Sequence, residues 1–423
     1  MNTFFQKLAT ILKDSAIRKR IIFTLGALVV FRLLATIPIP GVDAVSLEKL
    51  LAGNQFFGLL DIFSGGGISR LSIVMLGVGP YITASIIIQL LTMMFPSMKA
   101  MMQEEGEAGR AKLSQYSRLM SIPLAALQAF SFLALLQSQN VIAPLGGMAL
   151  LVNILIITAG SALLMWVGEL ISEFGIGNGV SLIIFSGIVA VLPAQIFQFV
   201  AAFESTDIPL YLIFVLVAIV VVVAVVVVTE AERPIAVTYA KQVRGNKVYG
   251  GVSTYLPLRL NQAGVIPIIF ALSILLFPQI IANFLVQVSN PTISSLAQNV
   301  ATFLNDPWTH GILYFIFVFI FTYFYTAVTF DPKMISENLQ KGGAFIPGVR
   351  PGESTMQYLG KVVTRITLVG ALFLGIIAVL PLVMQGFTGN QTLAIGGTAL
   401  LIVVSVVLDL LKKIDAQVSM REY

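Results

Sequence analysis

Ten apolar stretches, each close to the length that crosses a lipid bilayer, constrain this sequence more than any other feature. An α-helix needs about 20 residues to cross the hydrocarbon core. Lipid offers the backbone no hydrogen-bond partner, so each stretch is predicted to be a helix, including the valine-rich run 211–228, whose residue types favour strands in water. The predicted spans are residues 21–37, 71–95, 119–137, 149–168, 180–200, 209–229, 263–287, 311–330, 366–385 and 393–411.

The composition indicates a membrane protein and argues against enzymatic chemistry. Of the 423 residues, 57% are hydrophobic and 11% are charged, whereas soluble chains carry about 25% charged residues. Cysteine is absent and His310 is the only histidine, which excludes disulfides and thiolate nucleophiles and argues against a zinc site. No glycine-rich phosphate loop ending in Lys-Ser or Lys-Thr occurs. We therefore expect no enzyme activity, no cofactor and no metal.

The basic residues indicate how the chain is oriented in the membrane. With ten spans both termini lie on one side, and 22 of the 25 Lys and Arg residues fall on that side. The positive-inside rule then predicts that both termini are cytoplasmic.

An odd number of spans in each half implies that the halves are inverted relative to each other. The predicted fold is all-α, with two inverted five-helix halves around a central passage and a short plug helix. The expected parts are an N-terminal segment 1–20, a first half 21–200, a second half 201–411 and a cytoplasmic tail 412–423.

The N-terminal segment lacks the pattern of a cleavable signal peptide. Its apolar residues fall on one helical face, which favours an amphipathic helix on the membrane surface; a solvated tail is the alternative. They are Phe4, Phe5, Leu8, Ile11 and Leu12.

A broken apolar segment precedes the second span. Residues 56–64 are too few to cross the membrane, and glycines 65–67 interrupt the helix after them. Irregular backbone at membrane depth needs a cover of protein or water. We therefore expect residues 56–67 to fold back as a plug beside a passage.

Few polar residues occur within the spans. Arg32 and Asp409 lie near span ends, where such side chains usually reach the interface; ion-coupled carriers instead bury charge at mid-membrane. The amides Gln89, Asn178 and Asn261 lie in apolar surroundings, where an amide needs a partner. Asn178 also fits a simple helix cap, an equally good interpretation.

Two long basic loops, residues 230–262 and 331–365, are predicted on the cytoplasmic side. In the second, Arg350 stands between Pro347 and Pro351, which stiffen the backbone. These loops suit docking on an acidic protein or RNA. The alternative is that their charges only determine topology.

Seven stretches in family order, spread over nearly the whole chain, resemble the SecY family, the channel subunits of the bacterial Sec protein translocase. They are FRLLATIPIPG, MLGVGPYITASIIIQLL, EEGEAGRAKLSQYSR, GIGNGVSLIIFSGIVA, STYLPLRLNQAGVIPIIFA, FYTAVTFDP and GGAFIPGVRPGE.

This resemblance implies an hourglass passage closed by a ring of aliphatic side chains, sealed by a plug and able to open sideways to lipid. The implied ring is Val78, Ile82, Val180, Ile184, Ile269 and Ile402. The implied plug residues are Phe56, Phe57, Leu60, Ile62 and Phe63. The implied lateral-gate residues are Gln89, Asn178 and Asn261, and the implied docking residues are Lys241, Arg244, Lys247 and Arg350. Valine at two ring positions implies a slightly wider waist.

The resemblance also implies a function and partners. Signal peptides and unfolded polypeptides would cross the bacterial plasma membrane, and membrane segments would leave laterally into lipid. The SecA ATPase or a translating ribosome would drive this, with SecE and SecG subunits alongside. A secondary transporter of a small solute is the alternative, and a lipid-facing insertase scaffold without a pore is a third possibility.

Overall fold

The structure is a computed structural model in which part of the chain is described. The described residues are 14–40, 66–68, 70–138, 142, 146–201, 208–240, 242–244, 247–249, 253–286, 290–388 and 391–419. The predicted plug residues 56–63 and most of the N-terminal segment lie outside these ranges.

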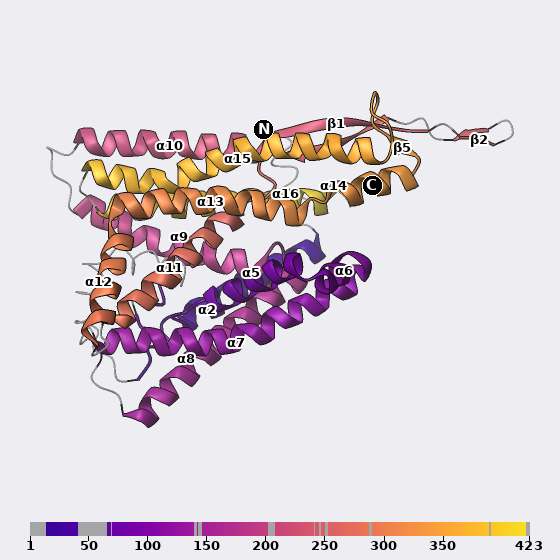
Figure 1. Cartoon of the computed structure of the whole chain (residues 1–423). Helices are drawn as coiled ribbons and strands as arrows, with labels where there is room; N and C mark the ends of the chain where they lie inside the picture. Colours follow the sequence, from indigo (N-terminus) through magenta and orange to yellow (C-terminus); the bar gives the residue numbers. More distant parts are fainter. Residues whose placement is uncertain are drawn as a thin grey trace.

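Each of the ten predicted spans coincides with a helix (Figure 1). These helices are α2 (Ser15–Leu34), α5 (Gly79–Met94), α7 (Gly106–Ser138), α8 (Gly147–Phe174), α9 (Gly179–Ala201), α10 (Ile208–Glu230), α11 (Ile266–Leu285), α13 (Pro307–Thr329), α15 (Glu353–Thr388) and α16 (Gln391–Ser419).

The described helices make this a multi-pass membrane protein. Within the described ranges, four helical segments are long and apolar enough to cross a bilayer unaided: Gly106–Ala134, Gly147–Phe174, Trp308–Lys341 and Glu353–Leu380. Shorter apolar helices accompany them, over Gly79–Met94, Gly179–Pro193, Val215–Glu230 and Ile266–Leu275.

The helix expected from residue 71 begins only at Gly79, because the preceding residues form turns. Gly77 has a φ of +56°, which other residues rarely adopt, and Pro80 occupies the first helical turn. The turns are covered by protein: the amide of Ile73 donates to the carbonyl of Ile37, and the hydroxyl of Ser161 on α8 donates to the carbonyl of Gly77. Buried irregular backbone of this kind is tolerated at membrane depth.

The all-α expectation is wrong for the first basic loop, which forms strands. Strands β1 (Glu232–Tyr239) and β4 (Ser253–Arg259) pair antiparallel, and β1 also pairs with β5 (Ala344–Phe345) from the second loop. Ile235 and Val237 both point into a buried cluster shared with α15. This alternation of buried and exposed residues is the period of two typical of a strand, and it can be found in the sequence. Strands β2 (Gln242–Arg244) and β3 (Lys247–Tyr249) extend this ribbon away from the helices (Figure 1).

Within the described ranges, three further helices lie outside the ten. Helices α6 (Pro96–Glu104) and α14 (Pro332–Lys341) lie at the same end of the molecule as the strands, whereas α12 (Pro291–Asn305) runs across the opposite end (Figure 1). At that end α12 contacts both α11 and α13.

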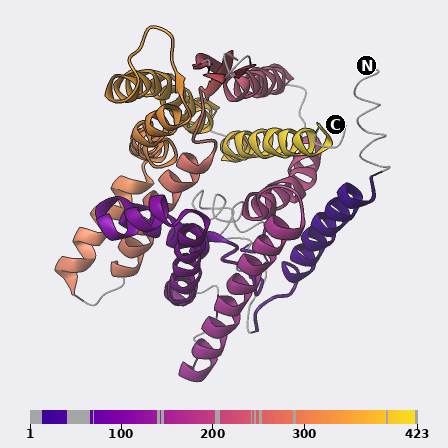
Figure 2. The same ribbon diagram turned by 90° about the vertical axis from the view of Figure 1, so that its right-hand side faces the viewer.

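The main core is built from both halves of the chain. Its largest apolar cluster runs from Phe31 on α2 to Val406 on α16, with contributions from α8, α9, α11, α13 and α15. Helix α2 packs at the edge against α8 and α9 (Figure 2).

Candidate functional site

The six predicted ring residues all belong to the main apolar cluster or pack against it. Val78, Ile184, Ile269 and Ile402 are buried there, and Ile82 and Val180 pack against it. They come from four different helical regions: the start of α5, then α9, α11 and α16. Both halves of the chain therefore contribute aliphatic side chains to this cluster.

A cavity of about 560 Å³ opens on one side of this cluster, bounded by α5, α7, α8, α9, α11 and α13. Four ring residues line it, namely Ile82, Val180, Ile184 and Ile269. Val78 and Ile402 are not part of its lining and are only 1% exposed. The cavity thus ends on the aliphatic cluster.

The remaining lining is largely polar. Serines, amides and charged side chains cover the walls formed by α5, α7, α8 and α9. They are Tyr81, Ser85, Gln89, Ser114, Arg118, Glu169, Ser172, Glu173, Asn178 and Ser181. Polar walls of this kind can form hydrogen bonds with water or with a polar ligand.

An ion pair between Arg118 on α7 and Glu169 on α8 spans this wall. Tyr81 on α5 lies close to both charges and to the side chain of Ser114. Sequence reasoning missed this pair because each residue adjoins the end of a predicted span. The sequence did contain a clue, because consecutive spans are antiparallel and the residue before one span therefore lies at the same membrane face as the residue after the next.

Two predicted gate amides, Gln89 and Asn178, line the same cavity. The Gln89 Nε2 donates to Ser85 Oγ at 3.5 Å, while its buried Oε1 has no partner among the described residues. Asn178 accepts a hydrogen bond from the Ser181 amide at 3.2 Å, so it caps α9 as well as facing the cavity. The helix-cap interpretation is confirmed, and a functional contact of Asn178 at the gate stays a prediction.

The third amide, Asn261, is placed elsewhere. It does not line the cavity, and its Nδ2 donates to the Gly264 carbonyl at 3.2 Å within the turn before α11. Its Oδ1 is buried without a partner among the described residues. Asn261 lies against α15 near Gly370, so it does not join Gln89 and Asn178.

The glycine run before α9 allows α8 and α9 to approach closely. A Cβ on Gly179 would lie 1.8 Å from the Gly168 carbonyl oxygen, a distance that no real side chain adopts. Gly177 has a φ of +95°. The close approach fixes the position of Asn178 and Val180 at the cavity wall.

The predicted docking residues lie at the end of the molecule that carries the strands. Arg350 is exposed, and its carbonyl accepts a hydrogen bond from Thr355 Oγ1 at 2.9 Å. Arg244 and Lys247 pair across the hairpin of β2 and β3, which projects furthest at this end (Figure 1). Lys241 lies outside the described residues.

Comparison with known proteins identifies the family. The family model described as SecY matches residues 72–411. The "Protein translocase subunit SecY" of Streptomyces coelicolor is 41% identical, with 97% of each chain covered. That of Mycobacterium bovis is 42% identical, covering 100% of this chain and 99% of the relative.

Two solved structures share the fold. One is described as "The plug domain of the SecY protein stablizes the closed state of the translocation channel and maintains a membrane seal", with a TM-score of 0.66, 19% identity, and 97% and 94% of the two chains covered. The other is Sec61 in the canine ribosome-channel complex, with a TM-score of 0.63, 19% identity and the same coverage. The resemblance seen in the sequence is thereby confirmed, and the chain belongs to the SecY family of protein translocase channel subunits.

Proposed function

We propose that unfolded polypeptides pass through this chain along the polar cavity and between the six aliphatic ring residues. The observation that carries the proposal is that Ile82, Val180, Ile184 and Ile269 line the cavity together with its polar residues. The chain acts as a conduit and not as an enzyme.

The ring seals the passage by excluding water. A constriction lined only by aliphatic side chains dewets, and this blocks ions. Such side chains form no hydrogen bonds that a passing polypeptide would have to break. The seal therefore yields to a chain that is pushed through it and closes behind it.

The lateral gate is proposed between the pair α5 and α7 and the pair α11 and α13. Both pairs bound the cavity, so separating them would connect the cavity with lipid. Gln89 lies on the first pair, and its Oε1 has no hydrogen-bond partner in the described part of the chain. A signal peptide entering the gate would find this carbonyl oxygen ready to accept a hydrogen bond.

The proposed topology has ten spans in two inverted halves, with both termini in the cytoplasm and the chain in the bacterial plasma membrane. The ten helices and the charge asymmetry support it. Residues 56–67 would form the plug on the far side of the ring.

The proposed motor is SecA or a translating ribosome, docking on Arg350 and on the β2–β3 hairpin. Support comes from the exposed side chain of Arg350, from the position of the hairpin at the same end of the molecule (Figure 1) and from the neighbour described as a ribosome-channel complex. SecE and SecG subunits complete the proposed assembly.

Cross-linking to a stalled secretory chain tests the conduit. The chain has no cysteine, so Ile82→Cys and Ile269→Cys each introduce a unique thiol on the proposed path. Val223→Cys, exposed on α10, is the control. Disulfides should form at the first two positions and not at the third. Equal yields at all three, or none at the ring, would reject the path.

A further inference from the structure

Helix α12 exposes an apolar stripe that no described part of the protein covers. Its exposed apolar residues recur at intervals of three and four, which places them on one side of the helix. They are Ile293, Leu296, Val300 and Phe303. Ala297, Ala301 and Leu304 are buried beside the stripe, so the protein covers only one flank of the apolar face.

The position of α12 identifies its level in the membrane. It runs across the ends of the helices that it contacts, α11 and α13 (Figure 1). Asp306 ends α12 and caps α13, and Trp308 follows with 60% of its surface exposed. Tryptophans in the first turn of a spanning helix mark the boundary between headgroups and hydrocarbon. The stripe therefore lies at that boundary.

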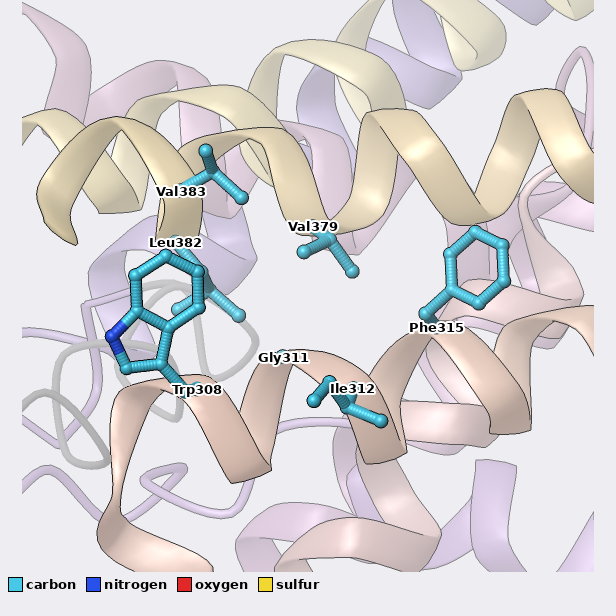
Figure 3. A pocket seen from close by; sticks show the side chains of 7 residues that line it. All are labelled: Trp308, Gly311, Ile312, Phe315, Val379, Leu382 and Val383. Atoms are coloured by element: carbon cyan, nitrogen blue, oxygen red, sulfur yellow. The ribbon is translucent and has the colours of Figure 1, made fainter. Parts of the chain in front are cut away.

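A groove continues from this boundary into the hydrocarbon. It has a volume of about 230 Å³ and lies between α13 and the far end of α15. Trp308, Ile312 and Phe315 form one wall, and Val379 and Leu382 form the other (Figure 3). Gly311 forms the floor of the groove. A Cβ at this position would lie 3.5 Å from Val379, so a side chain there would occupy the space between the two helices.

The groove is blind at its inner end. Phe315 lies so close to α15 that a Cβ on Gly375 would come within 2.7 Å of its ring. From Trp308 to Phe315 the helix rises about 10 Å, against about 30 Å for a spanning helix. This length suits an acyl chain in one leaflet and is too short for a partner's spanning helix.

We propose that the α12 stripe and the α13–α15 groove bind the acyl chains of phospholipids in the leaflet at this end of the protein. Helix α12 contains no Asp, Glu, Lys or Arg, so headgroup charge contributes no attraction and burial of apolar surface drives the contact. Binding is therefore insensitive to salt. The proposal does not depend on transport.

Spin-label accessibility tests the stripe in the full chain reconstituted in phospholipid vesicles. Nitroxides on Leu296→Cys and Phe303→Cys should collide several-fold more with oxygen, which dissolves in hydrocarbon, than with a water-soluble nickel chelate. Gln298→Cys and Thr302→Cys, exposed on the polar side, should show the reverse. Equal access of nickel to all four labels would place the stripe in water. Exclusion of both reagents at 296 and 303 would mean that protein covers it. Either result overturns the proposal.

A groove-filling variant tests the second part. Gly311→Leu should lower the number of phospholipids that native mass spectrometry finds on the purified protein by one. Ile320→Leu, exposed on the same helix, should leave it unchanged. Equal retention by the two variants would show that the groove holds no lipid.

Discussion

Arg118 and Glu169 form an ion pair that joins α7 to α8 on the wall of the cavity. The Glu169 side chain is only 20% exposed. Water therefore solvates its negative charge less than that of a surface acid, and the Arg118 guanidinium contributes more to its stabilisation. Arg118→Ala should destabilise the fold by about 1–2 kcal/mol, between the values for exposed and buried pairs. Thermal unfolding in detergent measures this.

A charge exchange separates this electrostatic effect from a packing effect. Arg118→Glu with Glu169→Arg should recover most of the loss. Lys413→Ala breaks a more exposed pair with Asp409 and should cost less than about 0.5 kcal/mol. A double variant no more stable than the single ones would refute the pairing.

The ring predicts different effects for two adjacent isoleucines on α9. Ile184 lines the cavity and Ile183 does not, although both are 2% exposed. Ile184→Ser should increase ion conductance in planar bilayers because a hydroxyl keeps water in the constriction. Ile183→Ser should lower stability by about as much as Ile184→Ser, but it should not increase ion conductance. Matching conductances would disprove the ring.

The close contact of Gly179 with α8 predicts that any larger residue at position 179 destabilises the protein. Gly179→Ala should cost about 1–3 kcal/mol or prevent folding, because its Cβ overlaps the Gly168 carbonyl. Gly26→Ala, with nothing within 4 Å of its Cβ, should be neutral or stabilising. Expression level and melting temperature report both, and a tolerated Gly179→Ala would show that α8 and α9 separate easily.

Arg350 should matter for driven transport and not for folding, because it is exposed. Arg350→Glu should abolish ATP-driven import into vesicles while the melting temperature stays constant. Lys333→Glu, exposed on nearby α14, is the matched control and should reduce import less. Normal import by the Arg350 variant would remove it from the docking surface.

Asp306 makes the junction between α12 and α13 sensitive to acid. Hydrogen bonds from the backbone and hydroxyl of Thr309 hold the pKa of this carboxyl below its ordinary 3.8. Its stabilising effect is complete above the ordinary value and is lost as the pH falls through the lowered one. A spin label at Phe303→Cys should become more mobile below pH 4, and Asp306→Asn should remove this transition. Persistence of the transition in the Asn variant would assign it to another group.

The helices could be predicted from the sequence because, in lipid, the length and polarity of a segment are enough to decide whether it forms a spanning helix. A run such as 149–168 has no stable alternative to a helix in hydrocarbon. The ring residues were identified by family resemblance, since aliphatic pairs at helical spacing occur throughout such a chain. All six belong to or pack against the main apolar cluster, and their arrangement as a ring stays a prediction.

Other features depended on tertiary contacts that no local pattern contains. The turns before Gly79 are stabilised by residues as distant in sequence as Ser161. Asn261 lies beside α15 and not beside Gln89. Helix α12 lies in a loop that is too polar to resemble a span, and its amphipathic period was the signal that could have revealed it.

Helix α15 begins three residues after Arg350 and reaches the lipid groove at Val379. No proline interrupts it between Glu353 and Leu380, so about 40 Å of continuous helix connects the two places. If a partner docks at Arg350 as proposed, a tilt of α15 at that end would also move its other end beside the groove. Lipids held in the proposed groove would then resist the tilt.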